Sequence, residues 1–83
     1  MTKVEMACII SFVNCLNARG VLVEGFHVRN DDDNWIAIYL KDKYLPEYAK
    51  IKESYVEGTM YIEFQGTLYG TCGSSSWQRL CKL

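Results

Sequence analysis

One histidine and four cysteines are the side chains in this sequence that could serve as a catalytic base or nucleophile. The histidine is His27, and the cysteines are Cys8, Cys15, Cys72 and Cys81. No serine or cysteine stands beside His27, and no carboxylate that could orient its ring falls on the same face of the predicted strand. A catalytic triad is defined by spatial geometry, but a lone strand histidine of this kind is typical of a packed or surface residue. We therefore expect no catalytic residue and no enzymatic activity.

The stretch from Cys72 to Arg79 has the small residues of a phosphate-binding thiolate loop, reading C-G-S-S-S-W-Q-R. The tyrosine-phosphatase pattern, C-x5-R, requires an arginine at position 78, where the chain has Gln78. The histidine that precedes the cysteine in that pattern is replaced by Thr71. A low-pKa cysteine of this type is therefore not predicted.

Asp31, Asp32 and Asp33 form an acidic cluster that could in principle hold calcium. An EF-hand loop needs a glycine at its sixth position and a glutamate at its twelfth, and these positions hold Ile36 and Asp42. The chain has no C-x-x-C pair either, so we expect no zinc site, no other metal and no cofactor. The cluster is expected to be a solvated hairpin tip, or an acidic knob that meets a basic surface.

The cysteines are expected to be reduced and buried, as in a cytosolic protein. Cys8 and Cys15 are separated by about 10.5 Å of helical rise, too far for a disulfide. A pairing of Cys15 with Cys72 or Cys81 stays geometrically open. The apolar run at 6–13 is shorter than the roughly 20 residues that a bilayer requires, and its flanks do not fit a secretion signal. We therefore expect a cytoplasmic protein without membrane contact.

Composition indicates one globular domain spanning residues 1–83. Of the 83 residues, 49% are hydrophobic and 13% aromatic, and the formal net charge is −1. Binding to a phosphate backbone depends on clustered positive charge, and the chain has no run of basic residues. Direct binding of nucleic acid is therefore not expected.

The clearest local pattern is W-I-A-I-Y-L-K at 35–41, whose strict alternation predicts a strand. Ile36, Ile38 and Leu40 share one face, and Trp35, Ala37 and Tyr39 share the other. A second strand at 21–29 and a turn at 30–34 complete an antiparallel hairpin.

Helices are predicted at 2–19, ending at Gly20, and at 45–56, beginning near Pro46. Ile10 falls within the polar strip of the first helix, either as a single exposed side chain or as the margin of a contact with a partner. Further strands are predicted at 59–65, 67–72 and 77–83, the last with a helical turn as its alternative. The fold class is α+β, with an antiparallel sheet of four to five strands in the order α-β-β-α-β-β-β.

Four aromatic residues fall opposite the aliphatic side chains of their predicted strands, namely Trp35, Tyr39, Tyr61 and Tyr69. If the first helix covers the aliphatic face, these rings lie beneath the second helix, are partly exposed without consequence, or form a surface for protein binding or self-association. Together with Asp31, Asp32 and Asp33, they are the predicted binding residues.

We therefore expect a protein-binding module without an active site, which modulates or inhibits a macromolecular partner such as a host protein or nucleoprotein complex. Short single-domain chains of this kind are typical of phage or mobile-element accessory proteins, including anti-CRISPR inhibitors of host defence, an analogy of size and type alone. The alternatives are a structural subunit that forms a homodimer or larger homo-oligomer, and a small nucleic-acid-associated protein.

Overall fold

The computed structural model describes residues 3–56, 59–72 and 77–82, and within these ranges it describes all side chains except those of residues 4, 33, 53–56, 59, 72 and 77–82. This part of the chain contains one helix, α1 (Lys3–Ala18), followed by six strands. The strands are β1 (Val23–Arg29), β2 (Asp32–Leu40), β3 (Glu47–Val56), β4 (Thr59–Phe64), β5 (Thr67–Cys72) and β6 (Trp77–Lys82).

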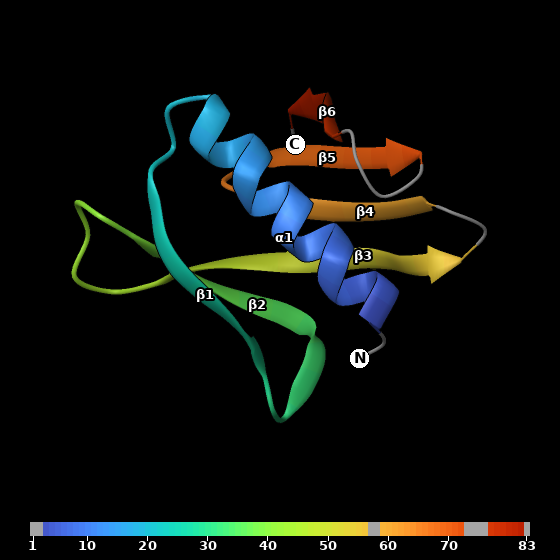
Figure 1. The fold of residues 1–83 in the computed structure, drawn as a ribbon, viewed down its shortest axis with the longest axis horizontal. Coiled ribbons are helices and arrows are strands. Elements are labelled where there is room, and N and C mark those ends of the chain that lie inside the picture. The colour runs from blue at the N-terminus through green and yellow to red at the C-terminus, as the bar shows by residue number, and fades with distance from the viewer. Residues whose placement is uncertain (1–2, 57–58, 73–76, 83) are drawn as a thin grey trace.

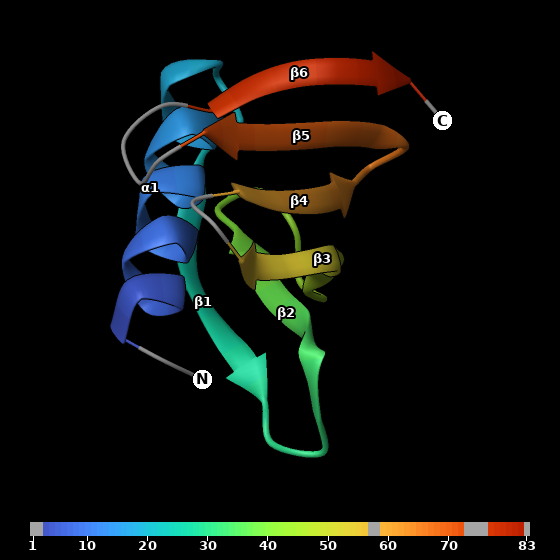
Figure 2. The ribbon, with the colours of Figure 1, turned by 90° about the vertical axis from the view of Figure 1, so that its right-hand side faces the viewer.

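The six strands form one antiparallel sheet in which each strand pairs with the next along the chain. Helix α1 crosses one side of this sheet diagonally, and the sheet curves around it (Figures 1 and 2). The structure thus confirms a small α+β domain with an N-terminal helix on an antiparallel sheet. In the described residues the sheet has one strand more than the upper end of the predicted range.

The predicted second helix at 45–56 is wrong, because residues Glu47–Val56 form strand β3. Glu47, Ala49 and Ile51 alternate with Tyr48, Lys50 and Lys52, so this stretch also fits a strand. Pro46 suits the entry to a strand as well as the first turn of a helix. Pairing on both sides, with β2 and β4, supplies the tertiary contacts that override the helical propensity of its lysines, glutamates and alanine.

The core lies between α1 and the concave side of the sheet. Cys8, Ile9, Phe12 and Leu16 are fully buried on the helix. The sheet contributes buried side chains from β1 to β5, namely Val23, Ile36, Ile38, Leu40, Ala49, Ile51, Met60, Ile62, Phe64 and Tyr69. The predicted aliphatic face of β2 is therefore confirmed. Full burial of one such side chain stabilises the fold by about 1.5–3 kcal/mol.

Helix α1 ends at Ala18 and is terminated, as predicted, at Gly20, in a Schellman motif. Gly20 adopts a left-handed φ of 88°. Its N–H donates to the carbonyl of Asn17 at 3.1 Å, and the N–H of Val21 donates to that of Leu16 at 2.9 Å. The Asn17 side-chain oxygen then accepts a hydrogen bond from the N–H of Val23 at 2.8 Å. The end of the helix therefore holds the first residue of β1 directly.

The β4–β5 hairpin turns through Gln65 and Gly66, with φ values of 51° and 73°. Positive φ at both central residues is characteristic of a type I′ turn, which matches the twist of the flanking strands. Phe64 pairs with Thr67 across this turn, which fixes which residues of β4 and β5 share a face. In the described part of the chain, no helix combines the length and the apolarity that crossing a membrane requires.

Candidate functional site

The side of the sheet away from α1, here called the outer face, is not covered by any helix or strand of the described chain (Figure 2). Cross-strand partners share a face, so the register assigns residues to it. Trp35 pairs with Lys50, which pairs with Glu63, and Ala37 pairs with Tyr48. These residues are the outer-face neighbours of the buried pairs Ile36–Ala49 and Ile51–Ile62.

Two aromatic rings and two cations form a continuous row on the outer face, here called the cation–ring row. The Trp35 and Tyr48 rings meet edge to face, with centroids 6.5 Å apart. The Lys50 ammonium lies 5.3 Å from the Trp35 centroid, and the Arg29 guanidinium lies 5.9 Å from the Tyr48 centroid. Both distances fall within the range of cation–π attraction, so the order Arg29, Tyr48, Trp35, Lys50 is held without a covering element.

A second ring pair stands next to this row. The His27 and Tyr39 rings are stacked with centroids 5.6 Å apart, and Tyr39 Oη and His27 Nδ1 share a hydrogen bond of 3.2 Å. Ala37 pairs with His27 on one side and Tyr48 on the other, and it is only 1% exposed although it lies on the outer face. The flanking rings therefore close over this small residue, while Tyr39 and Tyr48 keep 38% and 49% of their own surface exposed.

Trp35, Tyr39 and Tyr61 lie on the outer face as predicted, but the predicted placement of Tyr69 is wrong. Tyr69 pairs with the buried Ile62, is 7% exposed, and meets the ring of Phe12 edge-on at 5.2 Å. Alternation within 67–72 predicts that Leu68, the one aliphatic residue of this strand, faces the core and that Tyr69 faces away from it. The type I′ turn instead sets the register that turns Tyr69 towards α1, with the small side chains of Thr67 and Thr71 beside it.

Sequence reasoning missed Tyr48, Lys50 and Arg29 as members of the site. The first two were assigned to the second helix, whose periodicity separates them from Trp35. The strand-like alternation of 47–52 was the available signal, because a strand there places Tyr48 and Lys50 on one face. Further along that face, Lys52 Nζ and Glu63 Oε2 form an ion pair at 3.2 Å.

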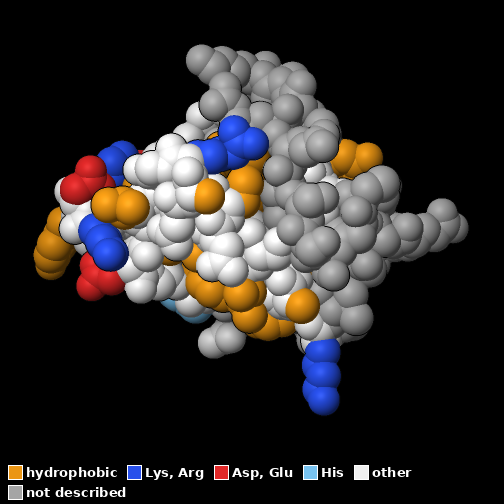
Figure 3. Space-filling view, turned by 45° about the horizontal axis from the view of Figure 1, so that its top comes forward, with side chains coloured by type: hydrophobic (Ala, Val, Ile, Leu, Met, Phe, Trp, Pro, Cys, Tyr) orange, Lys and Arg blue, Asp and Glu red, His pale blue; other side chains and the backbone are white. Residues whose placement is uncertain are grey.

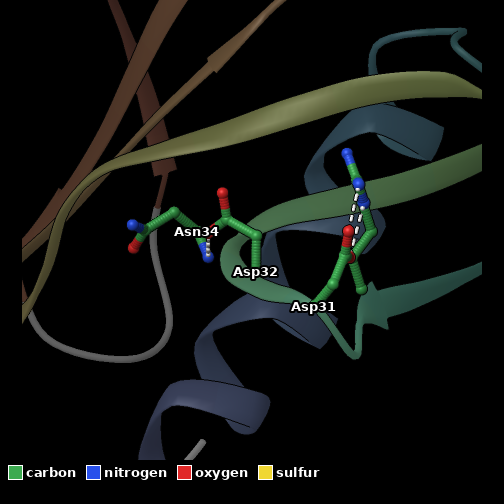
Figure 4. Close-up of polar contacts among 4 residues, drawn as sticks. Asp31, Asp32 and Asn34 are labelled. Carbon is green, nitrogen blue, oxygen red and sulfur yellow. Dashed lines mark hydrogen bonds and ion pairs between the residues drawn. The ribbon is translucent and has the colours of Figure 1, made fainter.

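The acidic tip is less strongly charged than its sequence indicates. The Asp31 carboxylate forms two hydrogen bonds with the Arg29 guanidinium, at 2.6 and 3.0 Å, and Arg29 thereby lowers the pKa of Asp31 (Figure 4). Asp32 Oδ1 accepts the backbone N–H of Asn34 at 2.9 Å, as in an Asx turn. The side chain of Asp33 lies outside the described residues. No cluster of three or more potential metal ligands occurs in the part of the chain described.

The cysteines whose side chains are described do not form a nucleophilic site. Cys8 is a buried thiol and Cys15 is half-buried, and the pairing of Cys15 with Cys72 or Cys81 stays a prediction because it depends on side chains that the structure does not describe. Burial raises the pKa of the Cys8 thiol, and the Glu5 carboxylate raises it further, both of which disfavour the reactive thiolate. The side chains of Cys72, Cys81 and Arg79 lie outside the described residues.

A cleft of about 310 Å³ opens at one end of the domain. It is lined by the segment 20–22, the segment 40–43 and Gln65. At this end, on the left in Figure 3, side chains of both charge signs lie beside hydrophobic ones. Lys43 is paired there with Glu47, and Tyr44 is 97% exposed. This mixture lacks a convergent set of catalytic groups.

No protein-family model matches the sequence, and no significant similarity to curated proteins or to solved structures is found. Function is therefore inferred from the chemistry of the surface itself.

Proposed function

We propose that this protein is a binding module without enzymatic activity, and that its outer face contacts another protein and thereby modulates or inhibits it. The supporting observation is that Trp35, Tyr39 and Tyr48 lie together on a face that no described element covers. Large aromatic side chains and arginine are the residues that most often dominate binding energy at protein interfaces.

The arrangement of the rings favours binding because it is already ordered. Trp35 is held by Tyr48 and Lys50, and Tyr39 is held by His27. Ordering a flexible side chain at an interface costs about 0.5–1.5 kcal/mol, and these contacts reduce that cost before the partner arrives.

Charge on the outer face favours a protein over a polyanion as the partner. Asp31 neutralises Arg29, and Glu63 neutralises Lys52. Lys50 is left as the cation without an ion pair among the described outer-face side chains. Binding to a phosphate backbone gains affinity with each uncompensated cation, so this surface offers it little.

Site-specific photo-crosslinking in cells of the source organism tests the proposal. A photoreactive phenylalanine analogue at Tyr48 is expected to capture a partner that the same analogue at Tyr44 does not. Tyr44 is a matched control, because it is also an exposed tyrosine, four positions away, but lies on the β2–β3 connection.

Affinity measurements with the captured partner then decide the role of the row. Trp35→Ala is expected to weaken binding by about 30-fold or more, as for an interface anchor worth at least 2 kcal/mol. Tyr44→Ala is expected to change the affinity by less than about threefold. Equal affinities for wild type and Trp35→Ala, with both proteins folded, would refute the proposal. A partner that belongs to a host defence system would identify the protein as an inhibitor of the anti-CRISPR kind.

A second candidate function, binding of single-stranded nucleic acid, is favoured by one observation, the two adjacent rings of the row with a cation at each end. Bases stack on such rings while cations contact phosphates. The variant Trp77→Phe leaves Trp35 as the sole tryptophan, whose fluorescence reports on the row directly. Quenching by oligothymidine that weakens steeply between 50 and 200 mM salt would support this candidate, and unchanged fluorescence would exclude it.

A further inference from the structure

We propose that two copies of this chain associate through the free edge of β1, which pairs antiparallel with β1 of the second copy to form one continuous sheet. Strand β1 is the first strand in the sheet order, and among the described strands it pairs only with β2. This edge is a different surface from the outer face, and the proposal does not depend on the proposed function.

The hydrogen-bond pattern identifies which groups of β1 are available. The backbone N–H of Val23 donates to the Asn17 side chain, so this N–H points away from β2. Val23 and its cross-strand partner Leu40 therefore form a non-hydrogen-bonded pair. Hydrogen-bonded and non-hydrogen-bonded positions alternate along an antiparallel pair. Counting along β2 from Leu40, the positions of Ile38 and Ile36 are therefore non-hydrogen-bonded as well. Their partners Phe26 and Val28 therefore direct their backbone N–H and C=O groups towards the open edge.

One register of a two-fold pair uses all of these groups. If Phe26 lies opposite Val28 of the second copy, and the reverse holds by symmetry, four hydrogen bonds form. Irregularities at Val23/Gly25 and at Val28/Arg29 bound this stretch on both sides. Bulges of this kind limit an edge to a short contact, so the pairing closes at two copies.

The side chains beside this edge are apolar. Phe26 and Val28 share the helix side with Ile38 and Ile36 but are only partly buried. On α1, Met6, Ile10 and Val13 follow one another at helical spacing, and Met6 and Ile10 are 36% and 47% exposed. A band of hydrophobic side chains crosses the lower part of Figure 3, on the side of the molecule where α1 lies. A strand added next to β1 covers this apolar surface.

Charge complementarity specifies a second copy as the occupant. The far end of β1 leads into the acidic tip, where Asp31 is paired with Arg29 and Asp32 has no ion pair among the described residues. At its near end lie Arg19, just after α1, and Lys41, whose N–H donates to the carbonyl of Leu22. Neither Arg19 nor Lys41 has an ion pair among the described residues. Antiparallel pairing places Asp32 of each copy near Arg19 and Lys41 of the other, and Arg29 of each copy near Glu24 of the other, twice by symmetry.

Sedimentation velocity of the purified protein between about 5 and 500 µM, a range that brackets micromolar dissociation constants, tests the association. We expect a concentration-dependent dimer, weakened more than about tenfold by Ile10→Glu and less than about threefold by Asn14→Glu. Asn14 is an exposed residue of the same helix, so the control carries the same added charge. Val28→Pro is expected to abolish the dimer while the fold is kept, because the Val28 N–H is not used in pairing with β2.

The register is tested by disulfide trapping. In the proposed pair, His27 lies opposite His27 of the second copy in a non-hydrogen-bonded position, where Cα atoms are about 4.5 Å apart and a disulfide can close. Oxidised His27→Cys should form a covalent dimer, whereas Tyr39→Cys, on the same face but one strand further from the axis, should not. A monomer throughout the concentration range, or a dimer lost in Trp35→Ala but kept in Ile10→Glu, would overturn the inference.

Discussion

The inward orientation of Tyr69 is the most sensitive test of the strand register, and we expect Tyr69→Ala to be far more destabilising than Tyr48→Ala. Both substitutions remove the same phenol ring from the same sheet. Tyr69 is 7% exposed and packs against Phe12, whereas Tyr48 is 49% exposed on the outer face. A one-residue slip in register would exchange the two faces of β5, so the comparison reports directly on which face Tyr69 occupies.

The magnitude follows from burial. A buried aromatic side chain removes about 150–250 Å² from water, which at roughly 25 cal/mol per Å² sets an upper bound of about 4–6 kcal/mol. Truncation of buried aromatic residues to alanine costs about 3–5 kcal/mol, and we expect about 3–4 kcal/mol for Tyr69→Ala. The half-exposed Tyr48 leaves no cavity in the core, so its loss should cost about 1 kcal/mol or less.

Urea denaturation followed by circular dichroism measures both values. A domain of this length has a total stability of about 4–12 kcal/mol, so Tyr69→Ala could unfold it entirely. Tyr69→Phe keeps the ring and its contact with Phe12, and it should retain a cooperative transition within about 1 kcal/mol of wild type. Equal destabilisation by Tyr69→Ala and Tyr48→Ala would show that the assigned register is wrong.

Three further predictions follow from local features. Gly20→Ala should lower the free energy of unfolding by about 1 kcal/mol in urea titrations, because φ at Gly20 is 88°; no change would contradict the Schellman ending. Arg29 lowers the pKa of Asp31, so the stabilisation from this pair is present above the ordinary aspartate value and is lost as the pH falls through the lower folded-state value. The stability difference between wild type and Asp31→Asn should therefore shrink between about pH 5 and pH 2, and a constant difference would rule this out. Iodoacetamide should alkylate Cys8 at least about tenfold more slowly than the partly exposed Cys15 when peptides are quantified by mass spectrometry, and similar rates would show that Cys8 is accessible.

The elements that were predicted correctly from the sequence are those in which the hydrophobic pattern and the intrinsic preferences of the residues indicate the same structure. Helix α1 has a wide apolar arc and is followed by a glycine, and residues 35–40 of β2 alternate between large aliphatic side chains and other residues. The hairpin of β1 and β2 follows from turn-forming residues between two such segments. In each case a single structure satisfies both the propensity and the pattern, so no tertiary information is required.

Segment 47–56 could not be assigned in this way because it carries two patterns at once. Its lysines, glutamates and alanine favour a helix, and Tyr48, Ile51 and Tyr55 recur at helical spacing. The alternation of Ala49 and Ile51 with Tyr48 and Lys50 favours a strand equally well. The outcome depends on unpaired backbone groups of β2 and β4, which only a strand between them satisfies.

The misplaced helix and the missed site residues share one physical cause. A helix at 45–56 would contain both Tyr48 and Lys50 and would be able to cover Trp35, leaving the outer face without a binding surface. A strand there reverses both consequences, because side chains on a strand alternate between faces. Tyr48 and Lys50 then lie beside Trp35, and no second helix remains to cover the rings. The candidate binding surface therefore exists because the backbone pairing of β3 with β2 and β4 prevails over the helical propensity of its sequence.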